Sequence, residues 1–328
     1  MKYFSIDNSD KKISTIGLGT MIFHPDSKDR DFSILNAFID QGGTFIDTAE
    51  VYGSVEEHGY SEMVIGDWLT DNSHIRDKIF IVGKGLIPGY CAPIHPGGAK
   101  INPEYIHKAI EGTLKRMKTE YLDLWMFHRD DPTHDVGPLV DALNEEIESG
   151  RIRGYGASNW GIKRIQEAID YANNNGKVAM QGSSPHFSLA KANEPYWPDT
   201  VVTDQNDKNW FEKNNFLLVA WSSLGRGFFA KGKKDFTDDA DLVRVFYSDD
   251  NFERKKRSTE LAKTKGISVY EIAVAYVINQ SFPVVALTGA ESPDEVKINT
   301  KAGSLELSAE EINWLDLTSN DQPLTMGN

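Results

Sequence analysis

The sequence predicts an α/β protein and, within that class, a (β/α)8 TIM barrel with an N-terminal β-hairpin and long substrate loops. Eight short apolar segments, rich in β-branched or aromatic residues, alternate with helical patterns, which is typical of parallel βαβ units. The chain has 328 residues, and such a barrel usually takes about 250 or more. No linker-like stretch divides the chain, so we expect one domain over residues 1–328. A doubly wound sheet is the alternative arrangement, and the count of eight favours the barrel.

The chain opens with a predicted hairpin, because MKYFSID and KKIST lie on either side of Asn8 and Ser9 and resemble its two arms. The eight predicted barrel strands follow at residues 14–20, 44–49, 79–84, 122–128, 152–158, 178–182, 216–221 and 284–289.

Helical patterns separate most of these strands. The segment 103–117 begins with Pro103 and has one apolar face, made of Ile106, Ile110, Leu114 and Met117. The other clear patterns are 137–150, 161–176 and the strongly apolar 268–279.

Three stretches have no such pattern. They are residues 85–102, 191–205 and 225–251, and each follows the end of a predicted strand. Loops in that position form the catalytic face of a barrel, so we expect these three to contact the substrate.

Composition excludes some classes of partner. The formal net charge of −14 argues against nucleic acid and against anionic membrane surfaces. The one cysteine, Cys91, cannot form an internal disulfide, and no apolar run has signal-peptide or membrane-spanning length. We therefore expect a cytoplasmic protein; the sequence leaves monomer and homo-oligomer open.

Polar residues stand where apolar strands end. Asp47, Lys84 and His128 each end a predicted strand, and Tyr52 follows in a loop. Buried Lys and Asp side chains need partners, and each can serve the other. A lysine ammonium beside a tyrosine favours the phenolate, lowers the phenol pKa and suits the tyrosine to general acid–base work. A histidine beside them can hydrogen-bond a carbonyl oxygen.

Taken singly, each of these residues has an ordinary structural explanation. Tyr52 could be a packed aromatic, Asp47 and Lys84 a structural ion pair, and His128 a core histidine. The combination favours proton transfer to an oxygen while a hydride reaches the neighbouring carbon.

Six motifs, in this order, carry a resemblance to a known family: GLGTM, FIDTAEVYG, IVGKG, LDLWMFHRDD, GRIRGYGASNW and VAWSSLGRGFF. Together they resemble the aldo-keto reductases from about Ile16 to Leu317. That family is a (β/α)8 barrel that binds NADP(H), or less often NAD(H), without a Rossmann domain. The chain has no G-x-G-x-x-G fingerprint.

The resemblance implies specific roles. The catalytic tetrad is Asp47, Tyr52, Lys84 and His128. Ser158 and Asn159 match the pair that holds the nicotinamide carboxamide, with Gln181 as third partner, and Trp221 stands where an aromatic ring stacks on the nicotinamide. The implied cofactor-binding residues are Gly19, Thr20, Met21, Asp47, Ser158, Asn159, Gln181, Trp221, Ser222, Ser223, Leu224, Gly225, Arg226, Gly227, Gly289, Ser292, Glu295 and Asn299.

One segment, LTGAESPDEVKIN, departs from the family pattern. Glu295 stands where the family often has Arg, and Gly289 where it often has Lys. A glutamate would repel a 2′-phosphate and could instead accept from a ribose hydroxyl. The cofactor is therefore NADP(H) or NAD(H), and the preference stays open.

The expected function is that of an NAD(P)(H)-dependent oxidoreductase, of alcohol dehydrogenase type, which interconverts an aldehyde or ketone and its alcohol. Tyr52 would be the general acid/base, and no metal is required. The expected substrate pocket contains Phe23, Tyr52, Tyr90, His128 and Trp160, although Phe23 and Trp160 could instead pack on the barrel rim. The long polar loops favour a small, sugar-derived or polyol-derived carbonyl compound.

Two other functions remain possible at this stage. The family includes potassium-channel β subunits, in which the barrel senses cofactor redox state, so a binding module with little turnover is one alternative. A metal-dependent sugar isomerase or hydrolase is another, but the eight histidines show no clustered ligand spacing.

Overall fold

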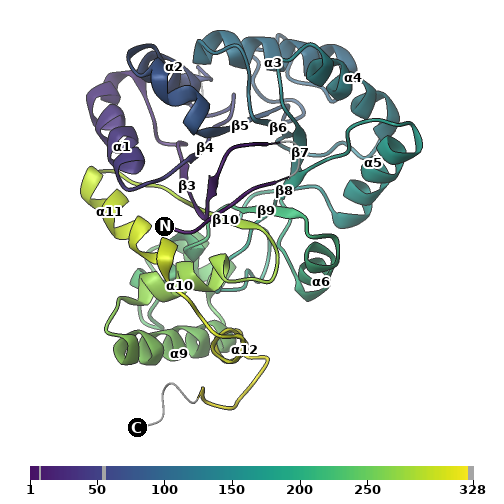
Figure 1. The fold of residues 1–328 in the computed structure, drawn as a ribbon. Helices are drawn as coiled ribbons and strands as arrows, with labels where there is room; N and C mark the ends of the chain where they lie inside the picture. Colours follow the sequence, from purple (N-terminus) through teal and green to yellow (C-terminus); the bar gives the residue numbers. More distant parts are fainter. Residues whose placement is uncertain (7–8, 54–56, 324–328) are drawn as a thin grey trace.

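Eight parallel strands form a closed barrel in the computed structural model, which describes residues 1–6, 9–53 and 57–323 (Figure 1). β10 pairs with both β9 and β3, and this closes the ring. The predicted (β/α)8 TIM barrel is thus confirmed. The barrel strands are β3 (Ile16–Gly19), β4 (Phe45–Asp47), β5 (Phe80–Gly85), β6 (Leu124–Phe127), β7 (Tyr155–Ser158), β8 (Gly182–Ser184), β9 (Leu217–Ala220) and β10 (Val284–Thr288).

Large side chains fill the inside of the barrel. The inner core contains Ile13, Phe45, Phe80, Val82, Leu124, Met126, Leu217, Val219, Val285 and Leu287. Gly17 leaves them room, because a Cβ there would lie 2.8 Å from side-chain atoms of Phe45, Val285 and Leu287. The interior is therefore filled with packed side chains, and chemistry is confined to the strand ends.

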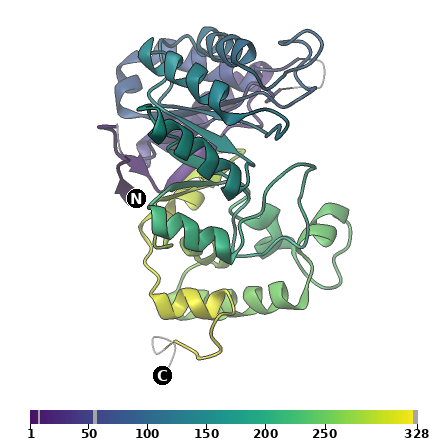
Figure 2. The same ribbon diagram turned by 90° about the vertical axis from the view of Figure 1, so that its right-hand side faces the viewer.

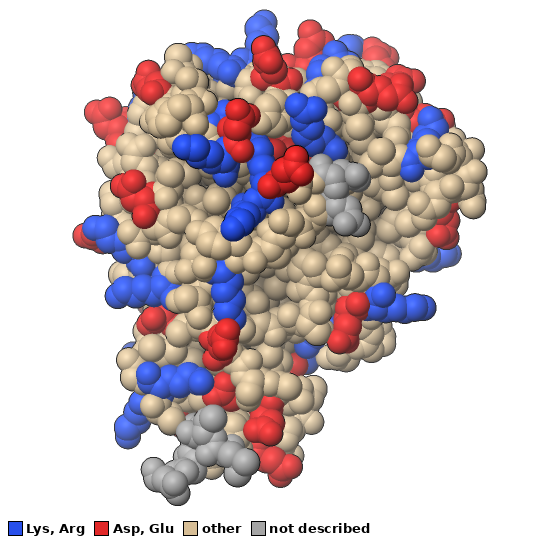
Figure 3. Space-filling view, viewed as in Figure 1, with Lys and Arg blue, Asp and Glu red and all other residues tan. Residues whose placement is uncertain are grey.

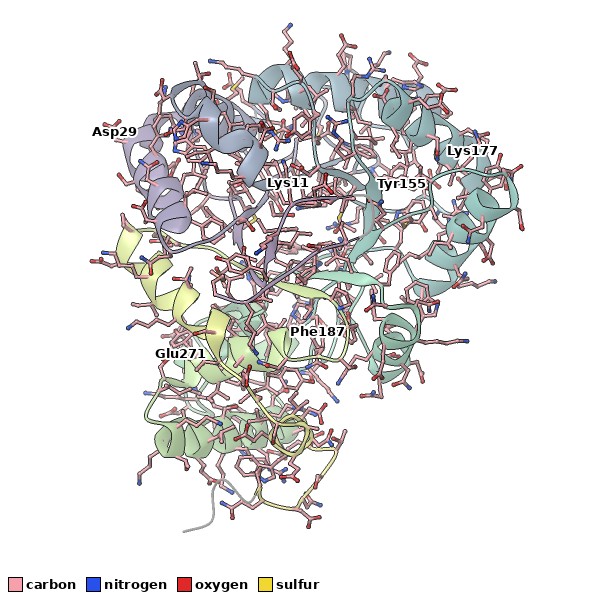
Figure 4. The ribbon with its side chains drawn as sticks, viewed as in Figure 1. Lys11, Asp29, Tyr155, Lys177, Phe187 and Glu271 are labelled. Atoms are coloured by element: carbon pink, nitrogen blue, oxygen red, sulfur yellow. The ribbon has the colours of Figure 1, made fainter. Side chains whose placement is uncertain are left out.

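An antiparallel hairpin covers the amino ends of the strands. Its arms are β1 (Tyr3–Phe4) and β2 (Ile13–Ser14), which confirms the predicted hairpin; Asn8 of the expected turn lies outside the described residues. Ile13 is fully buried in the barrel core, and Lys11 pairs with Asp123 at 2.6 Å. Lys11 is labelled in Figure 4. Figure 2 shows the hairpin on one side of the barrel and the long loops on the other.

Helices surround the barrel (Figure 1). α3 shows how the sequence specifies them: the Asn102 side chain accepts from the Tyr105 N–H at 3.0 Å, Pro103 opens the first turn, and the predicted apolar face is buried. The helices of this layer are α1 (Lys28–Asp40), α2 (Tyr60–Asp71), α3 (Pro103–Met117), α4 (Val136–Glu148), α5 (Ile162–Asn174), α6 (Gln205–Asn214), α10 (Val269–Ile278) and α11 (Pro293–Lys301).

A further layer lies beyond α10. α9 (Asp249–Lys265) packs on α10, and α12 (Ala309–Leu315) packs on α9, at the bottom of Figure 2. Arg257 of α9 donates to the carbonyl oxygens of Trp314 and Ser319 at 2.7 and 2.8 Å and so fixes the last described segment.

Two sequence predictions of local structure differ from the fold. The stretch 225–251, expected to be irregular, contains α7 (Phe228–Lys231) and α8 (Ala240–Phe246), and α8 is capped by the Asp239 side chain. The strand expected at 178–182 lies at Gly182–Ser184. A Cβ on Gly156 of β7 would lie 2.4 Å from the Gly182 carbonyl, so these strands approach too closely for large residues. The small residues of β8 carry no apolar pattern that would have revealed it.

Acidic and basic side chains alternate over the face seen in Figure 3, with no large field of one sign. No helix of the described residues is both long and apolar enough to span a bilayer.

Candidate active site

Three strands bring charged or polar side chains to one end of the barrel. Asp47 is the last residue of β4, Lys84 lies one residue before the end of β5, and His128 follows β6. Because the strands are parallel, these ends meet at one mouth. The three residues are only 1%, 3% and 8% exposed, so the polar groups are largely removed from water.

Lys84 and Asp47 form a buried ion pair, in which the Lys84 ammonium donates to both oxygens of the Asp47 carboxylate. Burial lowers the pKa of Lys84, but the charges of Asp47 and Tyr52 more than offset this, and the net pKa is raised. Lys84 therefore stays positively charged in a place where a lone ammonium would lose its proton.

Tyr52 completes the group from the loop after β4, where its N–H donates to the Ala49 carbonyl at 3.0 Å. The Lys84 ammonium lies 5.5 Å from the centre of the Tyr52 ring. The sequence argument expected Lys84 to lower the phenol pKa. In the structure, burial raises the pKa of Tyr52 and outweighs the opposing effect of Lys84. The phenol is thus neutral at physiological pH and is a proton donor.

His128 lies edge-on to Tyr52, with ring centres 5.9 Å apart and planes at 82°. Burial, together with the positive charges of Lys84 and Arg129, lowers the pKa of His128 well below 6.5. The imidazole is therefore neutral. Within the described part of the chain, its buried Nδ1 has no hydrogen-bond partner.

A second polar group adjoins His128. Asn159, with φ at 61°, donates from its side-chain amide to the His128 carbonyl at 3.3 Å and to the Ser158 hydroxyl at 2.9 Å. The Trp221 indole donates to the Asn159 side-chain oxygen at 3.3 Å. The structure thus brings Ser158, Asn159 and Trp221 together beside the tetrad.

Gln181 is not part of this group. Its N–H donates to the Tyr155 carbonyl at the amino end of β7. Its side chain lies against Gly154: a Cβ added to that glycine would come 1.9 Å from Oε1 of Gln181. Ser184 is instead in register with Ser158. The buried Ser184 hydroxyl has no hydrogen-bond partner among the described residues. In the sequence, Pro185 indicates that a strand ends at Ser184, because a strand commonly ends just before a proline.

The loop from Ser222 to Gly227 has an unusual backbone. Ser222, Gly225, Arg226 and Gly227 all have positive φ, between 52° and 88°. The Ser223 hydroxyl donates to the Leu287 carbonyl at 2.7 Å and anchors the loop to β10. Successive N–H groups in such a conformation form a concave surface that suits an anion.

Two aromatic residues of the 191–205 stretch, which was expected to contact the substrate, cover this loop. Trp197 packs against Trp221 with ring centres 5.5 Å apart. The Arg226 guanidinium lies 4.7 Å from the Tyr196 ring centre and 5.2 Å from that of Trp197.

Glu295 lies in the first turn of α11. Its carboxylate accepts from the Glu291 N–H at 2.8 Å, while its own N–H donates to the Ser292 hydroxyl at 3.3 Å. Asn299 donates to the Gly289 carbonyl at 2.9 Å. The Glu295 carboxylate therefore already supplies the negative charge that a helix N-terminus favours.

The expected pocket residues differ in exposure. Tyr90 is 62% exposed, whereas Phe23 and Trp160 are each 1% exposed. Trp160 stacks on Phe127 and donates its indole N–H to the Arg129 carbonyl at 3.1 Å. Phe23 and Trp160 therefore form the wall behind the mouth, while Tyr90 remains open to solvent beside it.

A buried carboxylate links a substrate loop to the tetrad. Glu50 accepts from the Leu86 N–H at 2.7 Å and contacts His95 Nε2 at 3.0 Å, and its own N–H donates to the Lys84 carbonyl at 2.9 Å. The 85–102 stretch is thus anchored to β4 and β5. His95 also lines a cleft of about 810 Å³ between α2 and α3, which includes none of the tetrad.

No group of three or more His, Cys, Asp or Glu side chains in the described part of the chain is arranged to hold a metal ion.

The chain resembles known proteins over nearly its whole length. A family model described as the aldo/keto reductase family matches residues 15–319. "Protein tas" of Escherichia coli is 29% identical, with 94% of each chain covered. "Aldo-keto reductase YhdN" of Bacillus subtilis is 27% identical, over 98% of this chain and 92% of the relative. The crystal structure of an aldo-keto reductase from Klebsiella pneumoniae in complex with NADPH is 25% identical, covers 94% of this chain and 91% of its own, and superimposes with a TM-score of 0.69.

Proposed function

We propose, from the premise that this chain belongs to the aldo/keto reductase family, that it reduces an aldehyde or ketone to an alcohol with Tyr52 as the proton donor. Membership of the family makes it an NAD(P)H-dependent carbonyl oxidoreductase. The observation that carries the catalytic part is the convergence of a neutral phenol, a charged lysine and a neutral imidazole at one barrel mouth.

The residues at the mouth fit a nicotinamide cofactor. The half-buried Trp221 offers a ring face. Ser158 and Asn159 would hold the carboxamide, and the unpartnered Ser184 hydroxyl fits as their third partner in place of Gln181. The N–H groups of the Ser222–Gly227 loop would hold the pyrophosphate.

In the reaction, the bound cofactor supplies the hydride. The neutral His128 donates a hydrogen bond to the substrate carbonyl oxygen and orients it. Tyr52 gives its proton to that oxygen, and Lys84 stabilises the phenolate that remains. Asp47 keeps Lys84 charged and in place. In the oxidative direction the same phenolate would accept the proton.

We further propose that NADH is accepted at least as well as NADPH, because Glu295 stands where the family often has Arg, and its carboxylate would repel a 2′-phosphate. The polar 85–102 and 191–205 stretches around the mouth favour a sugar-derived or polyol-derived substrate.

The test combines cofactor binding with turnover. Titration with NADH and, separately, NADPH should quench tryptophan fluorescence, since Trp221 lies at the site. Tyr52→Phe should lower the rate of aldehyde reduction by about 10²–10⁴-fold while binding persists. Tyr171→Phe, which removes a hydroxyl bonded to Asp141 on the outer helices, is the matched control.

A Tyr52→Phe variant that kept more than about a tenth of the rate would exclude Tyr52 as the acid. Saturable cofactor binding without turnover of any aldehyde by the unmodified protein would instead indicate a redox-sensing module.

A further inference from the structure

Arg129 lies at the mouth of the barrel, and beyond its effect on the pKa of His128 it has no role in the chemistry proposed above. It follows His128 directly and is half-buried. Its Nη1 donates to the His128 carbonyl at 2.9 Å, and the Asn159 side chain donates to the same oxygen at 3.3 Å. The guanidinium is therefore held close to the catalytic histidine.

The groups that act electrostatically on Arg129 come from three different loops. Burial lowers the pKa of Arg129, and Tyr52, Asp199 and Tyr90 act in the opposite direction. Tyr52 follows β4, Tyr90 follows β5 and Asp199 follows β8. All three loops leave the carboxyl ends of barrel strands, where substrates bind, so the guanidinium lies among the elements that receive the substrate.

Asp199 acts on Arg129 at a distance, and no acidic side chain of the described residues contacts it. Across residues 1–6, 9–53 and 57–323 it forms no ion pair, and its one side-chain hydrogen bond goes to the neutral His128 carbonyl. Two neighbouring cations differ, because Lys84 is bound to Asp47 and Arg164 contacts Asp130 at 3.5 Å, while Arg226 is stacked on the rings of Tyr196 and Trp197. A half-buried charge without a counter-ion in contact is costly, and a ligand anion would relieve that cost.

We propose that Arg129 binds a carboxylate of the substrate, so that the enzyme prefers aldehydes or ketones that carry an acid group. The proposal rests on the reductase function above and specifies its substrate class. A guanidinium can donate two parallel N–H bonds to one carboxylate, which fixes orientation as well as affinity. An oxidised sugar derivative with both a carbonyl and a carboxylate would suit the polar loops as well.

The test compares two substrates that differ only in charge. 4-Carboxybenzaldehyde carries the acid, and its methyl ester, methyl 4-formylbenzoate, is neutral and of similar shape. We expect the unmodified enzyme to show a kcat/KM at least about tenfold higher for the acid, as removal of one charge-assisted hydrogen bond implies. Arg129→Gln should remove this preference, and Arg129→Lys should keep part of it.

The matched control is Arg153→Gln. Arg153 is exposed, lies before β7 at the far end of the barrel, and stacks over Tyr121 at 4.7 Å. It should retain the preference for the acid. Equal kcat/KM values for acid and ester in the unmodified enzyme, or an equal loss for both in Arg129→Gln, would overturn the proposal.

Binding provides a readout that does not depend on turnover. In the presence of NADH, 4-(hydroxymethyl)benzoate should bind at least about tenfold more tightly than its methyl ester, as measured by quenching of tryptophan fluorescence. Arg129→Gln should abolish this difference in affinity. Reduction of either aldehyde tests the reductase function separately. If neither aldehyde were reduced but the acid still bound selectively, the reductase function would fail while the role of Arg129 stood. Equal binding of acid and ester would overturn the role of Arg129 alone.

Discussion

The ion pair of Lys84 and Asp47 shows how strongly the site depends on single residues. Both are almost fully buried, and each is the other's only opposite charge. Removal of one partner from such a pair leaves an uncompensated charge away from water.

We therefore expect Lys84→Met to lower the free energy of unfolding by about 3–5 kcal/mol. The double variant Asp47→Asn/Lys84→Met should regain more than half of that loss, because no buried charge remains. Urea unfolding followed by circular dichroism would measure both. Strictly additive effects of the two substitutions would contradict the buried-pair interpretation.

The protonation states of His128 and Tyr52 predict the pH dependence of reduction. His128 acts as a neutral donor, and its pKa is lowered well below 6.5, so it stays active as pH falls through that value. Tyr52 acts as an acid, and its pKa is raised above 10.0, so its proton is retained until pH exceeds that value. We expect kcat/KM for reduction to be flat from neutral pH up to 10 and to fall only above it. A decline centred near pH 8 would show that Lys84, and not burial, sets the tyrosine pKa.

Sequence reasoning reached some site residues and not others for a physical reason. Asp47, Lys84 and His128 interrupt apolar runs, so each stands out as a polar group at the end of a strand. Ser184 belongs to a strand of small residues with no such contrast. Arg129 and Trp197 acquire their roles from contacts between loops, and a single sequence does not encode those contacts locally.

At the scale of the element, α11 carries the residues proposed to meet the adenosine end of the cofactor. Its N-terminus is already satisfied by Ser292 and by the carboxylate of Glu295. The proposed cofactor preference depends on this helix start.

We expect Glu295→Gln to raise affinity for NADPH about tenfold relative to NADH, since it removes a charge close to the expected 2′-phosphate. Separate fluorescence titrations with the two cofactors would measure the ratio. Asp294→Asn is the control, because Asp294 is exposed and pairs with Lys297 at 2.9 Å. A Glu295→Gln variant whose affinity ratio did not change would place the phosphate elsewhere.

Elements with strong local patterns were predicted best. α3 was found at its observed bounds because its cap, its Pro103 and its apolar face agree. α7 and α8 were missed because they are short and depend on tertiary contacts: α7 packs against α10, and Phe228 of α7 contacts Phe246 of α8.

At the scale of the whole molecule, the closed ring of strands predicts cooperative behaviour. No barrel strand can detach without breaking its hydrogen bonds to two neighbouring strands. The inner core contains side chains from most of the strands. The count of eight strand segments predicted this architecture from the sequence, although one strand was displaced by several residues.

We expect one unfolding transition for the chain, with intrinsic fluorescence and circular dichroism giving the same midpoint in urea. This would support a single domain over residues 1–328. An earlier transition confined to the α9 and α12 layer, detected by protease cleavage there below the main midpoint, would contradict it.

The pairing of β3 with β10 also has a consequence for synthesis. Leu18 and Thr288 lie side by side in the ladder, yet 270 residues separate them along the chain. At a translation rate of about 5–20 residues per second, the ribosome needs about 14–54 s to make the second after the first. Throughout that interval one edge of β3 has no partner strand. The nascent chain therefore has an unpaired strand edge that is hydrogen-bonded to β10 in the folded protein.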